Sequence, residues 1–548
     1  MTSFGSRILL FLTIIPEYCD AMLTQMMNDS TSDNTIQFDV AKLLSSLEQR
    51  SGLSLDSRKI QPGDVFVAIP GLQEHGLIHA RQAIEHGASA IIFDPAAGGA
   101  KLAQELVSDK ILSITLMEQP HLKDHIGLLA SSFYQHPSHQ VDVVGITGTN
   151  GKTSCSHFVA QAMSALKQRN DHHHMCCGYI GTLGWGVPGS SHPTTNTTPD
   201  AIESHKMLAA LVQQGVETVA MEVSSHGLAQ NRLQGVKVAG AVFTNLGRDH
   251  LDYHQSADHY LNAKLQLFRT PGLGFAVINL DDPVSHKVSQ VIVDDVRVLG
   301  FSLRSTNHLS ADTLTINNVN FNQYGSTFQV FFRGQQQLVT LPLIGEFNIA
   351  NALTTVGVMI GLGVDFTVAV DALQYLTPVT GRMDKISTEH DEISVYVDYA
   401  HSPDALTVAL QTVRQHCAKK IWVVFGCGGN RDQGKREQMG EIASRLADHL
   451  VVTDDNPRYE DGDKIISDIV KGCNETSVQI IRDRPTAIQT AIHAAKLGDS
   501  VLIAGKGHEA TQEINGAIVP CDDRQIAKLI LGKLHIQHQS NQSTSLER

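Results

Sequence analysis

A glycine-rich loop between an apolar strand and a helix constrains this chain more than any other segment. Residues 141–146 (VDVVGI) have the pattern of a buried strand, and a helix is predicted over 153–166. Glycines let backbone N–H groups turn toward an anion, Lys152 can neutralise phosphates, and the Thr153 hydroxyl suits Mg²⁺. The pattern predicts a phosphate-binding loop, in a variant form because Ile146 stands where the strict motif has glycine. The loop reads Gly145-Ile146-Thr147-Gly148-Thr149-Asn150-Gly151-Lys152-Thr153.

The composition is that of a folded chain with several domains. It has 548 residues, of which 42% are hydrophobic, and a net charge of −14. The acidic balance argues against nucleic-acid binding, which needs a basic surface. The eight cysteines form no CxxC pair, so we expect no disulfide framework and a reducing, cytoplasmic location.

The first residues do not predict a membrane anchor. Residues 8–15 (ILLFLTII) are apolar, but a bilayer span needs about 20 residues. Without a small-residue cleavage site, we interpret this segment as an atypical extension or a mis-assigned start, with Met22, Met26 and Met27 as alternative starts. We expect no membrane partner and a monomer.

A histidine-rich cluster leaves two interpretations open. Residues 171–177 read DHHHMCC. A metal site is one interpretation. Adjacent cysteines cannot easily both face one metal, so a His-rich loop that enters a buried strand is favoured.

Strands and helices alternate along most of the chain, which predicts an α/β fold. In the first region, strands are predicted over 65–69 and 88–93 with a helix over 80–86. In the second, strands are predicted over 216–223 and 238–244, then hairpins over 310–341. In the third, strands over 421–425, 450–453 and 501–504 each run into a polar loop, where open α/β sheets bind ligands. Residues 535–548 are predicted to be disordered.

Two further strand ends carry metal-ligating residue types. Glu222 ends the predicted strand 216–223, where an acid commonly completes the Mg²⁺ site of a phosphate-loop protein. His250 follows the strand 238–244 and is either a second metal ligand or a hydrogen-bonded loop histidine.

Taken in order, the motifs over residues 53–524 resemble those of the Mur ligase family of ATP-dependent, amide-forming enzymes. They are Asp56-Ser57-Arg58, TGTNGKT (147–153), NTTPD (196–200), MEVSSHGL (221–228), RDHLDYH (248–254), Gly345-x-Phe347-Asn348-x-x-Asn351, GRM (381–383), DYAH (398–401), GCGG (426–429), DDNPR (454–458) and GKGHE (505–509).

The resemblance implies three domains, at 1–138 for the N-terminal extension and UDP end of the substrate, 139–378 for ATP, and 379–548 for the incoming amino acid. The central domain would be a P-loop ATPase and the last a Rossmann-like doubly wound sheet. The implied reaction adds meso-2,6-diaminopimelate to UDP-N-acetylmuramoyl-L-alanyl-D-glutamate through an acyl phosphate, in peptidoglycan precursor synthesis.

The resemblance also implies roles for single residues. Those matching the UDP-muramoyl-dipeptide site are Leu55, Ser57, Gln73, Asn196, Thr197, Thr198, Ser224, Gln230 and Arg232. Those matching the ATP site are Gly148, Thr149, Asn150, Gly151, Lys152, Thr153, Ser154, Asn348, Asn351, Arg382 and Asp398. Those matching the diaminopimelate site are Arg431, Asp455, Asn456, Pro457, Arg458, Gly505 and Glu509.

Lys264 matches a family lysine that is carbamylated, which turns a cation into an anionic oxygen ligand. With Thr153, Glu222 and His250 it would bind Mg²⁺, and Lys152, Glu222, His250 and Lys264 would be catalytic. The alternatives are a lysine-adding ligase of the same family, a folylpolyglutamate- or cyanophycin-synthetase-like ligase, a GTPase or transport ATPase, and an ATP-binding scaffold without catalysis. The DNPR form favours diaminopimelate, since Arg458 can pair with its second carboxylate.

Overall fold

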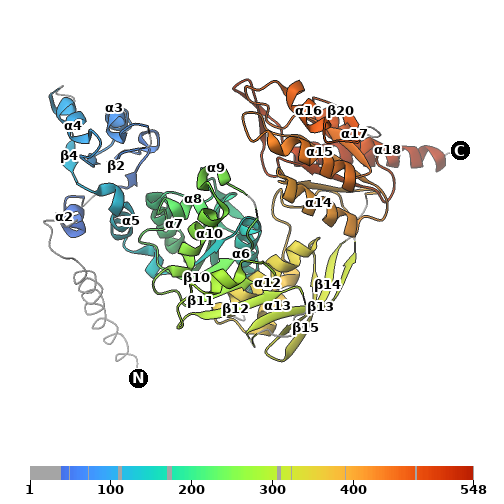
Figure 1. Ribbon diagram of the computed structural model, residues 1–548, viewed down its shortest axis with the longest axis horizontal. Coiled ribbons are helices and arrows are strands. Elements are labelled where there is room, and N and C mark those ends of the chain that lie inside the picture. Colours follow the sequence, from blue (N-terminus) through green and yellow to red (C-terminus); the bar gives the residue numbers. More distant parts are fainter. Residues whose placement is uncertain are drawn as a thin grey trace. The chain divides into compact units, whose positions relative to one another are not determined.

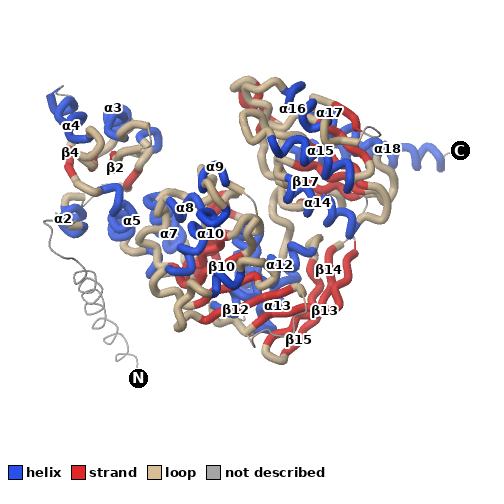
Figure 2. Tube along the Cα trace, viewed as in Figure 1, coloured by secondary structure: helices blue, strands red, loops and turns tan. Residues whose placement is uncertain are grey.

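The computed structural model describes residues 39–47, 50–71, 73–108, 114–168, 176–247, 249–304, 310, 312–322, 324–388, 391–474 and 478–546. The chain divides into two compact units, Met1–His125 and Ile126–Arg548. Figure 1 labels the elements, and Figure 2 shows strands and helices alternating in both units. The predicted α/β class is confirmed.

The first unit holds a parallel sheet in the order β1-β2-β3-β4. Its strands are β1 (Leu53–Ser54), β2 (Val65–Ala68), β3 (Ala90–Phe93) and β4 (Thr115–Glu118), and its helices are α2 (Val40–Ser45), α3 (Ala80–Glu85) and α4 (Gly99–Ser108). The predictions for 65–69, 80–86 and 88–93 are confirmed. Gly87 ends α3 at φ +96°, a conformation that favours glycine.

The second unit begins within α5 (Leu122–Phe133) and contains a large mixed sheet in the order β15-β14-β13-β12-β11-β10-β5-β9-β6-β7-β8. Strands β6 to β13 of this order pair in parallel, and the hairpins at each end are antiparallel. The strands are β5 (Asp142–Thr147), β6 (Cys177–Gly181), β7 (Gly184–Val187), β8 (Ser190–His192), β9 (Thr218–Glu222), β10 (Val238–Phe243), β11 (Phe275–Asn279), β12 (Arg297–Ser302), β13 (Thr313–Asn322), β14 (Gly325–Phe332) and β15 (Gln335–Leu341).

Helices cover both faces of this sheet. Alternate residues of β5 point to opposite sides, so Val144 packs with α6 and α12 in one core while Val143 packs with α7 in the other. The helices are α6 (Lys152–Gln168), α7 (Ala201–Gln213), α8 (Ser225–Ala229), α9 (Leu251–His254), α10 (Ala257–Leu265), α11 (Ser285–Ser289), α12 (Glu346–Gly361) and α13 (Phe366–Asp371). Strand β5 thus enters the glycine-rich loop and α6 follows, as predicted.

The C-terminal part of the second unit forms another sheet, in the order β16-β17-β21-β18-β19-β20, parallel apart from β16. The strands are β16 (Asp384–Lys385), β17 (Ser394–Asp398), β18 (Ile421–Phe425), β19 (His449–Val452), β20 (Val478–Ile480) and β21 (Ser500–Ala504), with a hairpin of β22 (Thr511–Ile514) and β23 (Ala517–Pro520). Helices α14 (Pro403–His416), α15 (Gly434–Leu446) and α16 (Gly462–Val470) pack in one core, and α17 (Arg484–Ala494) and α18 (Asp523–Leu546) in the other. This is a doubly wound sheet.

The prediction of a disordered tail over 535–548 is wrong for most of that segment, since α18 continues to Leu546. The helix begins on a buried face, with Asp523, Ala527, Ile530 and Leu531 at helical spacing against the sheet. Once this face is docked, polar residues further along extend an existing helix at little cost. No helix in the described part of the chain is both long and apolar enough to cross a bilayer.

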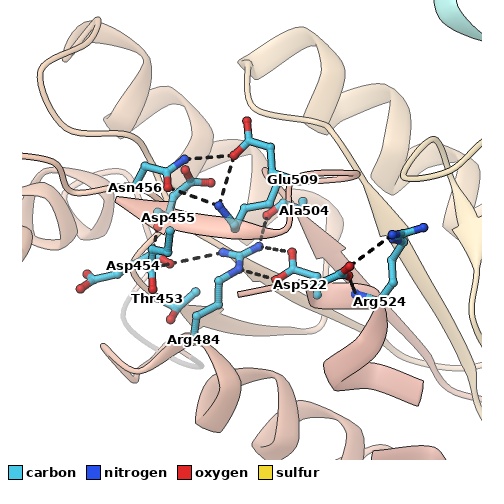
Figure 3. Close-up of polar contacts among 12 residues, drawn as sticks. Thr453, Asp454, Asp455, Asn456, Arg484, Ala504, Glu509, Asp522 and Arg524 are labelled. Atoms are coloured by element: carbon cyan, nitrogen blue, oxygen red, sulfur yellow. Dashed lines mark hydrogen bonds and ion pairs between the residues drawn. The ribbon is translucent and has the colours of Figure 1, made fainter. Parts of the chain in front are cut away.

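A fully buried ion pair joins α17 to α18. Arg484 Nε and Nη2 lie 2.8 and 2.7 Å from the two carboxylate oxygens of Asp523, and neither side chain is exposed. Arg484 also donates to the carbonyl oxygens of Ala504 and Asp454 at the ends of β21 and β19 (Figure 3). The pair therefore fixes two helices against the strand ends that carry the third region's polar loops.

We expect Asp523→Asn to lower the free energy of unfolding by about 3–5 kcal/mol, because it removes the only carboxylate that is hydrogen-bonded to the buried Arg484 guanidinium among the described residues. Urea unfolding followed by circular dichroism measures this. The control is Asp463→Asn on α16, which removes an exposed partner of Arg482 and should cost under about 1 kcal/mol. Equal effects of the two substitutions would contradict the assigned role.

Candidate functional site

The glycine-rich loop lies between β5 and α6 and is fixed by the end of β10. Asn245 accepts the N–H of Thr149 through its carbonyl and the N–H of Asn150 through Oδ1, both at 2.9 Å. Gly148 (φ +151°) leaves no room for a Cβ beside the Thr244 hydroxyl, and a Cβ at Gly151 (φ +89°) would lie 2.8 Å from Asn351 Oδ1. The loop therefore needs glycine at both positions.

Two lysines converge on this loop. Lys152 Nζ donates to the carbonyls of Gly148 (2.7 Å) and Thr149 (2.8 Å), and Lys264 Nζ donates to Gly148 at 2.9 Å. Lys264 lies on α10, buried, over the ring of Tyr260 at 4.4 Å. Burial lowers the pKa of both amines, and the charge of Lys152 adds to the depression of the pKa of Lys264, well below its ordinary value.

Glu222, at the end of β9, is fully buried and its carboxylate accepts hydrogen bonds from two elements. Oε2 accepts the hydroxyls of Thr153 (2.9 Å) and Thr182 (3.2 Å), and Oε1 accepts the N–H of Thr182 (2.8 Å). Burial raises the pKa of Glu222, while the charge of Lys152 and these donors oppose that rise. Because the Thr153 proton points at Glu222, its oxygen lone pairs remain available to a cation.

His250 lies in a cluster of aromatic rings that includes Tyr260, the ring under Lys264, with the two ring centroids 6.2 Å apart. It has φ +53°, is exposed, and its ring centroid lies 4.7 Å from that of His226 on α8. His226 also contacts Tyr253 (4.2 Å) and His254 (5.4 Å). Among the described residues, no three His, Cys, Asp or Glu side chains converge as they would around a metal.

The residues of the predicted dipeptide site gather around β9 and α8. The Thr198 hydroxyl donates to the Glu222 carbonyl (2.9 Å), and Ser224 caps α8 through the N–H of Gly227. Arg232 donates to the Thr198 carbonyl (2.7 Å) and to Gln230 Oε1 (2.7 Å). Thr197 lies 3.0 Å from Thr182 between hydroxyl oxygens, and Asn196 is exposed.

The remaining predicted ATP residues lie on α12 and at the edge of the C-terminal sheet. Asn351 Nδ2 donates to Asn348 Oδ1 (3.2 Å), and Asn348 Nδ2 donates to Ile344 (2.9 Å). The Arg382 guanidinium lies 4.6 Å from the centroid of the Tyr399 ring. Asp398 accepts the N–H of Met383 at 2.7 Å; burial raises the pKa of this carboxyl, and Arg382 opposes the rise. Ser154 is buried in the first turn of α6.

A polar cluster occupies the ends of β19 and β21. Asn456 Nδ2 donates to Glu509 Oε2 at 3.0 Å (Figure 3). The fully buried Lys506 Nζ lies 3.2 Å from the same oxygen, 3.3 Å from Asn456 Oδ1 and 2.6 Å from the carbonyl of Thr511. Since Asn456 Oδ1 also accepts the N–H of Glu513 (3.0 Å), the orientation of this amide is fixed.

The other acceptor residues surround this cluster. Asp455 is buried, and its burial raises the pKa of the carboxyl against the charges of Arg484 and Lys506. Gly505 (φ +115°) approaches it so closely that a Cβ would lie 2.6 Å from Asp455 Oδ2. Arg458 (φ +53°) lies 3.2 Å from Glu513 and donates to Gly429 (2.9 Å). Pro457 is buried and Arg431 is exposed.

The predicted UDP residues lie in the first unit. Ser57 is buried and donates to Gln82 at 2.7 Å, Leu55 is half-buried and Gln73 is exposed. The apolar segment 8–15, the alternative starts and residues 172–175 of the His-rich cluster lie outside the described residues. Cys177 enters β6, as expected for a buried strand.

Comparison with known proteins gives the family. Residues 50–134 match a family model described as "Mur ligase family, catalytic domain". Residues 146–359 match the "Mur ligase middle domain", and residues 381–507 match the "Mur ligase, glutamate ligase domain". The UDP-N-acetylmuramoyl-L-alanyl-D-glutamate–2,6-diaminopimelate ligase of Alkalilimnicola ehrlichii is 44% identical over 482 residues, 88% of this chain and 95% of that protein. The chain belongs to the Mur ligase family.

Other members of this family support the assignment. The ligase of the same description from Coxiella burnetii is 40% identical over 87% of this chain and 95% of its own. A solved structure of such a ligase is 33% identical, with a TM-score of 0.62 over 89% of this chain and 95% of its own. MurF from Thermotoga maritima, solved in complex with ADP, is 18% identical with a TM-score of 0.59 over 89% of this chain and 99% of its own, and so matches in fold alone.

Two polar residues near the candidate site, Lys506 and Thr182, were not predicted from the sequence. Lys506 lies inside the GKGHE motif, and its place between two glycines was a usable signal. Thr182 follows β6 without any pattern that marks it, because its partners Glu222 and Thr197 come from other parts of the chain.

An ion pair supports the loop that carries Arg431. Arg436 is fully buried and lies 2.7 Å from Glu460, and Glu460 Oε2 accepts the N–H of Asn430. Hydrogen bonding from Arg436 lowers the pKa of Glu460 from 4.5 to about 2. A carboxyl whose pKa is depressed on folding stabilises the fold above its unfolded pKa, and this contribution is lost as pH falls toward the folded value.

We therefore expect Glu460→Gln to reduce the loss of unfolding free energy between about pH 5 and about pH 3. Urea titrations across this window measure it, with Glu441→Gln, an exposed change on α15, as the control. A variant whose acid dependence equals that of the unmodified protein would contradict the role given to the pair.

Proposed function

We propose that this Mur ligase joins an amine of meso-2,6-diaminopimelate to the γ-carboxylate of the D-glutamate in UDP-N-acetylmuramoyl-L-alanyl-D-glutamate, with conversion of ATP to ADP and phosphate. The relatives named for this activity cover nearly the whole chain. The observation that carries the choice of acceptor is the cluster of Asn456, Arg458, Lys506 and Glu509 at the ends of β19 and β21.

This cluster suits an amino acid with charged groups at both ends. Arg458 offers a planar guanidinium that can bind a carboxylate through two parallel hydrogen bonds. Glu509, held by Asn456 and Lys506, offers a carboxylate to an ammonium group. L-Lysine lacks the second carboxylate and would leave Arg458 without a substrate partner, which is the kind of loss that gives strong discrimination. Arg431, Asp455, Pro457 and Gly505 complete the proposed acceptor site.

We expect Arg458→Ala to lower kcat/KM for diaminopimelate by roughly 10- to 100-fold, through loss of a charged hydrogen-bonding partner. Coupled ADP-release kinetics at saturating ATP and UDP-muramoyl-dipeptide measure this, with KM for ATP unchanged. Arg445→Ala, an exposed change on α15, is the control. Unaltered diaminopimelate kinetics in the Arg458 variant would refute the assignment.

ATP is proposed to bind at residues 148–154, with Asn348 and Asn351 near the adenine. An Asn side chain both donates and accepts, as the edge of adenine requires. Arg382 and Asp398 would reach the nucleotide from the C-terminal sheet. Asn196, Thr197, Thr198, Ser224, Gln230 and Arg232 would bind the muramoyl-dipeptide, and Leu55, Ser57 and Gln73 the UDP end. We propose domains at 1–138, 139–378 and 379–548, supported by the family models that match residues 50–134, 146–359 and 381–507.

The donor set beside the phosphate loop fits Mg²⁺. Glu222 and Thr153 present hard oxygen atoms that share a hydrogen bond, the arrangement that phosphate-loop proteins use. We propose that Thr153 and Glu222, with His250 and carbamylated Lys264, hold the metal, which when bound offsets the negative charge of the phosphates.

The chemistry requires activation of a carboxylate. The D-glutamate γ-carboxylate attacks the γ-phosphorus of ATP, and ADP leaves with the bridging oxygen. The diaminopimelate amine then attacks the acyl carbon, loses a proton, and releases phosphate from a tetrahedral intermediate. Lys152 would stabilise the charge that develops in the first transfer, and Glu509 and Arg458 would position the amine for the second.

We propose that Lys264 carries a carbamate. CO₂ adds only to a neutral amine, with loss of one proton, and the buried Lys264 has a pKa well below its ordinary value. A ¹³C NMR spectrum with ¹³C-bicarbonate should show a protein carbamate signal that Lys264→Ala removes and that Lys464→Ala, an exposed change on α16, retains. A signal that survives Lys264→Ala would contradict the assignment.

A cytoplasmic location agrees with the free thiols of the described cysteines.

A further inference from the structure

Thr182 lies between two parts of the proposed active site. It follows β6, and its N–H and hydroxyl contact the two carboxylate oxygens of Glu222 at 2.8 and 3.2 Å. Its hydroxyl oxygen also lies 3.0 Å from that of Thr197. Gly181, just before it, presses against the same carboxylate so closely that no Cβ could be accommodated. The turn after β6 is therefore shaped around Glu222.

The proton count fixes the direction of these hydrogen bonds. A threonine hydroxyl has one proton, and that of Thr182 is given to Glu222. The contact with Thr197 therefore requires Thr197 to donate and Thr182 to accept. Glu222 in turn accepts the proton of Thr153, in the phosphate loop. A continuous chain runs from Thr197 through Thr182 and Glu222 to Thr153.

The direction of the hydrogen bond from Thr197 to Thr182 determines how Thr197 can bind a ligand. Since its proton is given to Thr182, its oxygen can only accept. A substrate group that binds it must therefore be a donor, such as a peptide N–H. A donor at Thr197 would strengthen the hydrogen bonds from Thr197 to Thr182 and from Thr182 to Glu222, because hydrogen bonds in a chain polarise one another. Glu222 Oε2 accepts the hydroxyls of both Thr182 and Thr153, so a change in the bond from Thr182 alters what this oxygen offers to Thr153 and to a metal.

We propose that Thr182 is a positioning residue that couples occupancy of the 196–198 loop by the dipeptide to the nucleotide–metal site at Glu222 and Thr153. The inference rests on the proposed function, which places the dipeptide at Thr197 and the metal at Glu222. A separate tie, from the Thr198 hydroxyl to the Glu222 main chain, holds the loop itself in place. Loss of the Thr182 hydroxyl therefore removes the side-chain coupling and leaves the loop anchored.

The test measures linkage between two ligands. Isothermal titration calorimetry gives the Kd of Mg²⁺ with AMP-PNP, a non-hydrolysable ATP analogue, with and without saturating UDP-N-acetylmuramoyl-L-alanyl-D-glutamate. The ratio of the two Kd values is the coupling factor, which we expect to be at least about 5 in the unmodified protein. Thr182→Ser keeps the hydroxyl and should keep the factor. Thr182→Val should bring it close to 1.

Two further variants keep the test decisive. Thr197→Val removes the outer end of the chain without touching Glu222, and should abolish coupling to the same extent as Thr182→Val, with no additional loss in the double variant. It decides the question if Thr182→Val unfolds. Thr490→Val, on α17, is the matched control and should keep the full factor.

The outcomes separate this proposal from the function beneath it. Full coupling in Thr182→Val and Thr197→Val, or binding of both ligands without coupling in the unmodified protein, would overturn the role of Thr182 and leave the ligase assignment intact. Failure of the unmodified protein to bind the nucleotide or the dipeptide would overturn the proposed function, and the coupling with it.

Discussion

A buried carboxylate, Glu222, is the group on which the proposed active site depends. Burying an ionised carboxylate without partners costs free energy, so hydrogen-bond donors must offset its desolvation. Those donors come from the first turn of α6 and from the turn after β6, while its own carbonyl accepts the Thr198 hydroxyl. The parallel sheet brings the ends of β5, β6 and β9 to one edge, and Glu222 there joins the glycine-rich loop to the loop 196–198 that is proposed to bind the dipeptide.

Most strands and helices of the fold could be predicted because they depend on local sequence patterns. The apolar runs that became β5, β9 and β10, and the repeated strand-and-loop units of the third region, carry periodicity that burial requires. The glycine-rich loop between β5 and α6 was predictable for the same reason, since its glycines and Lys152 lie close together in the chain. The prediction of a disordered tail failed because α18 is stabilised by the packing of Asp523 and Ala527 against the rest of the fold. The polar composition of the following residues gives no sign of this tertiary contact.

The geometry of the candidate site was predictable only in part, and mainly through the family resemblance. Lys264 shows no local sign of function, and its burial against Gly148 and Tyr260 depends on how α10 packs. Thr182 contacts Glu222 and Lys506 contacts Asn456, and strand order brings these pairs together from distant parts of the sequence. In the sequence, Arg484 likewise resembles an ordinary helix-terminal arginine. Only the structure shows its buried ion pair with Asp523 of α18. In each case the missing information is a long-range contact.

The central claim is the identity of the three substrates, and it is tested most directly by the amino-acid dependence of ADP release. The purified protein is supplied with ATP, Mg²⁺ and UDP-N-acetylmuramoyl-L-alanyl-D-glutamate, and each candidate amino acid is added in turn. We predict ADP and phosphate formation that requires the UDP-dipeptide and meso-diaminopimelate together, with one new amide formed per ADP. Equal turnover with L-lysine, or ADP release that needs neither substrate, would contradict the account.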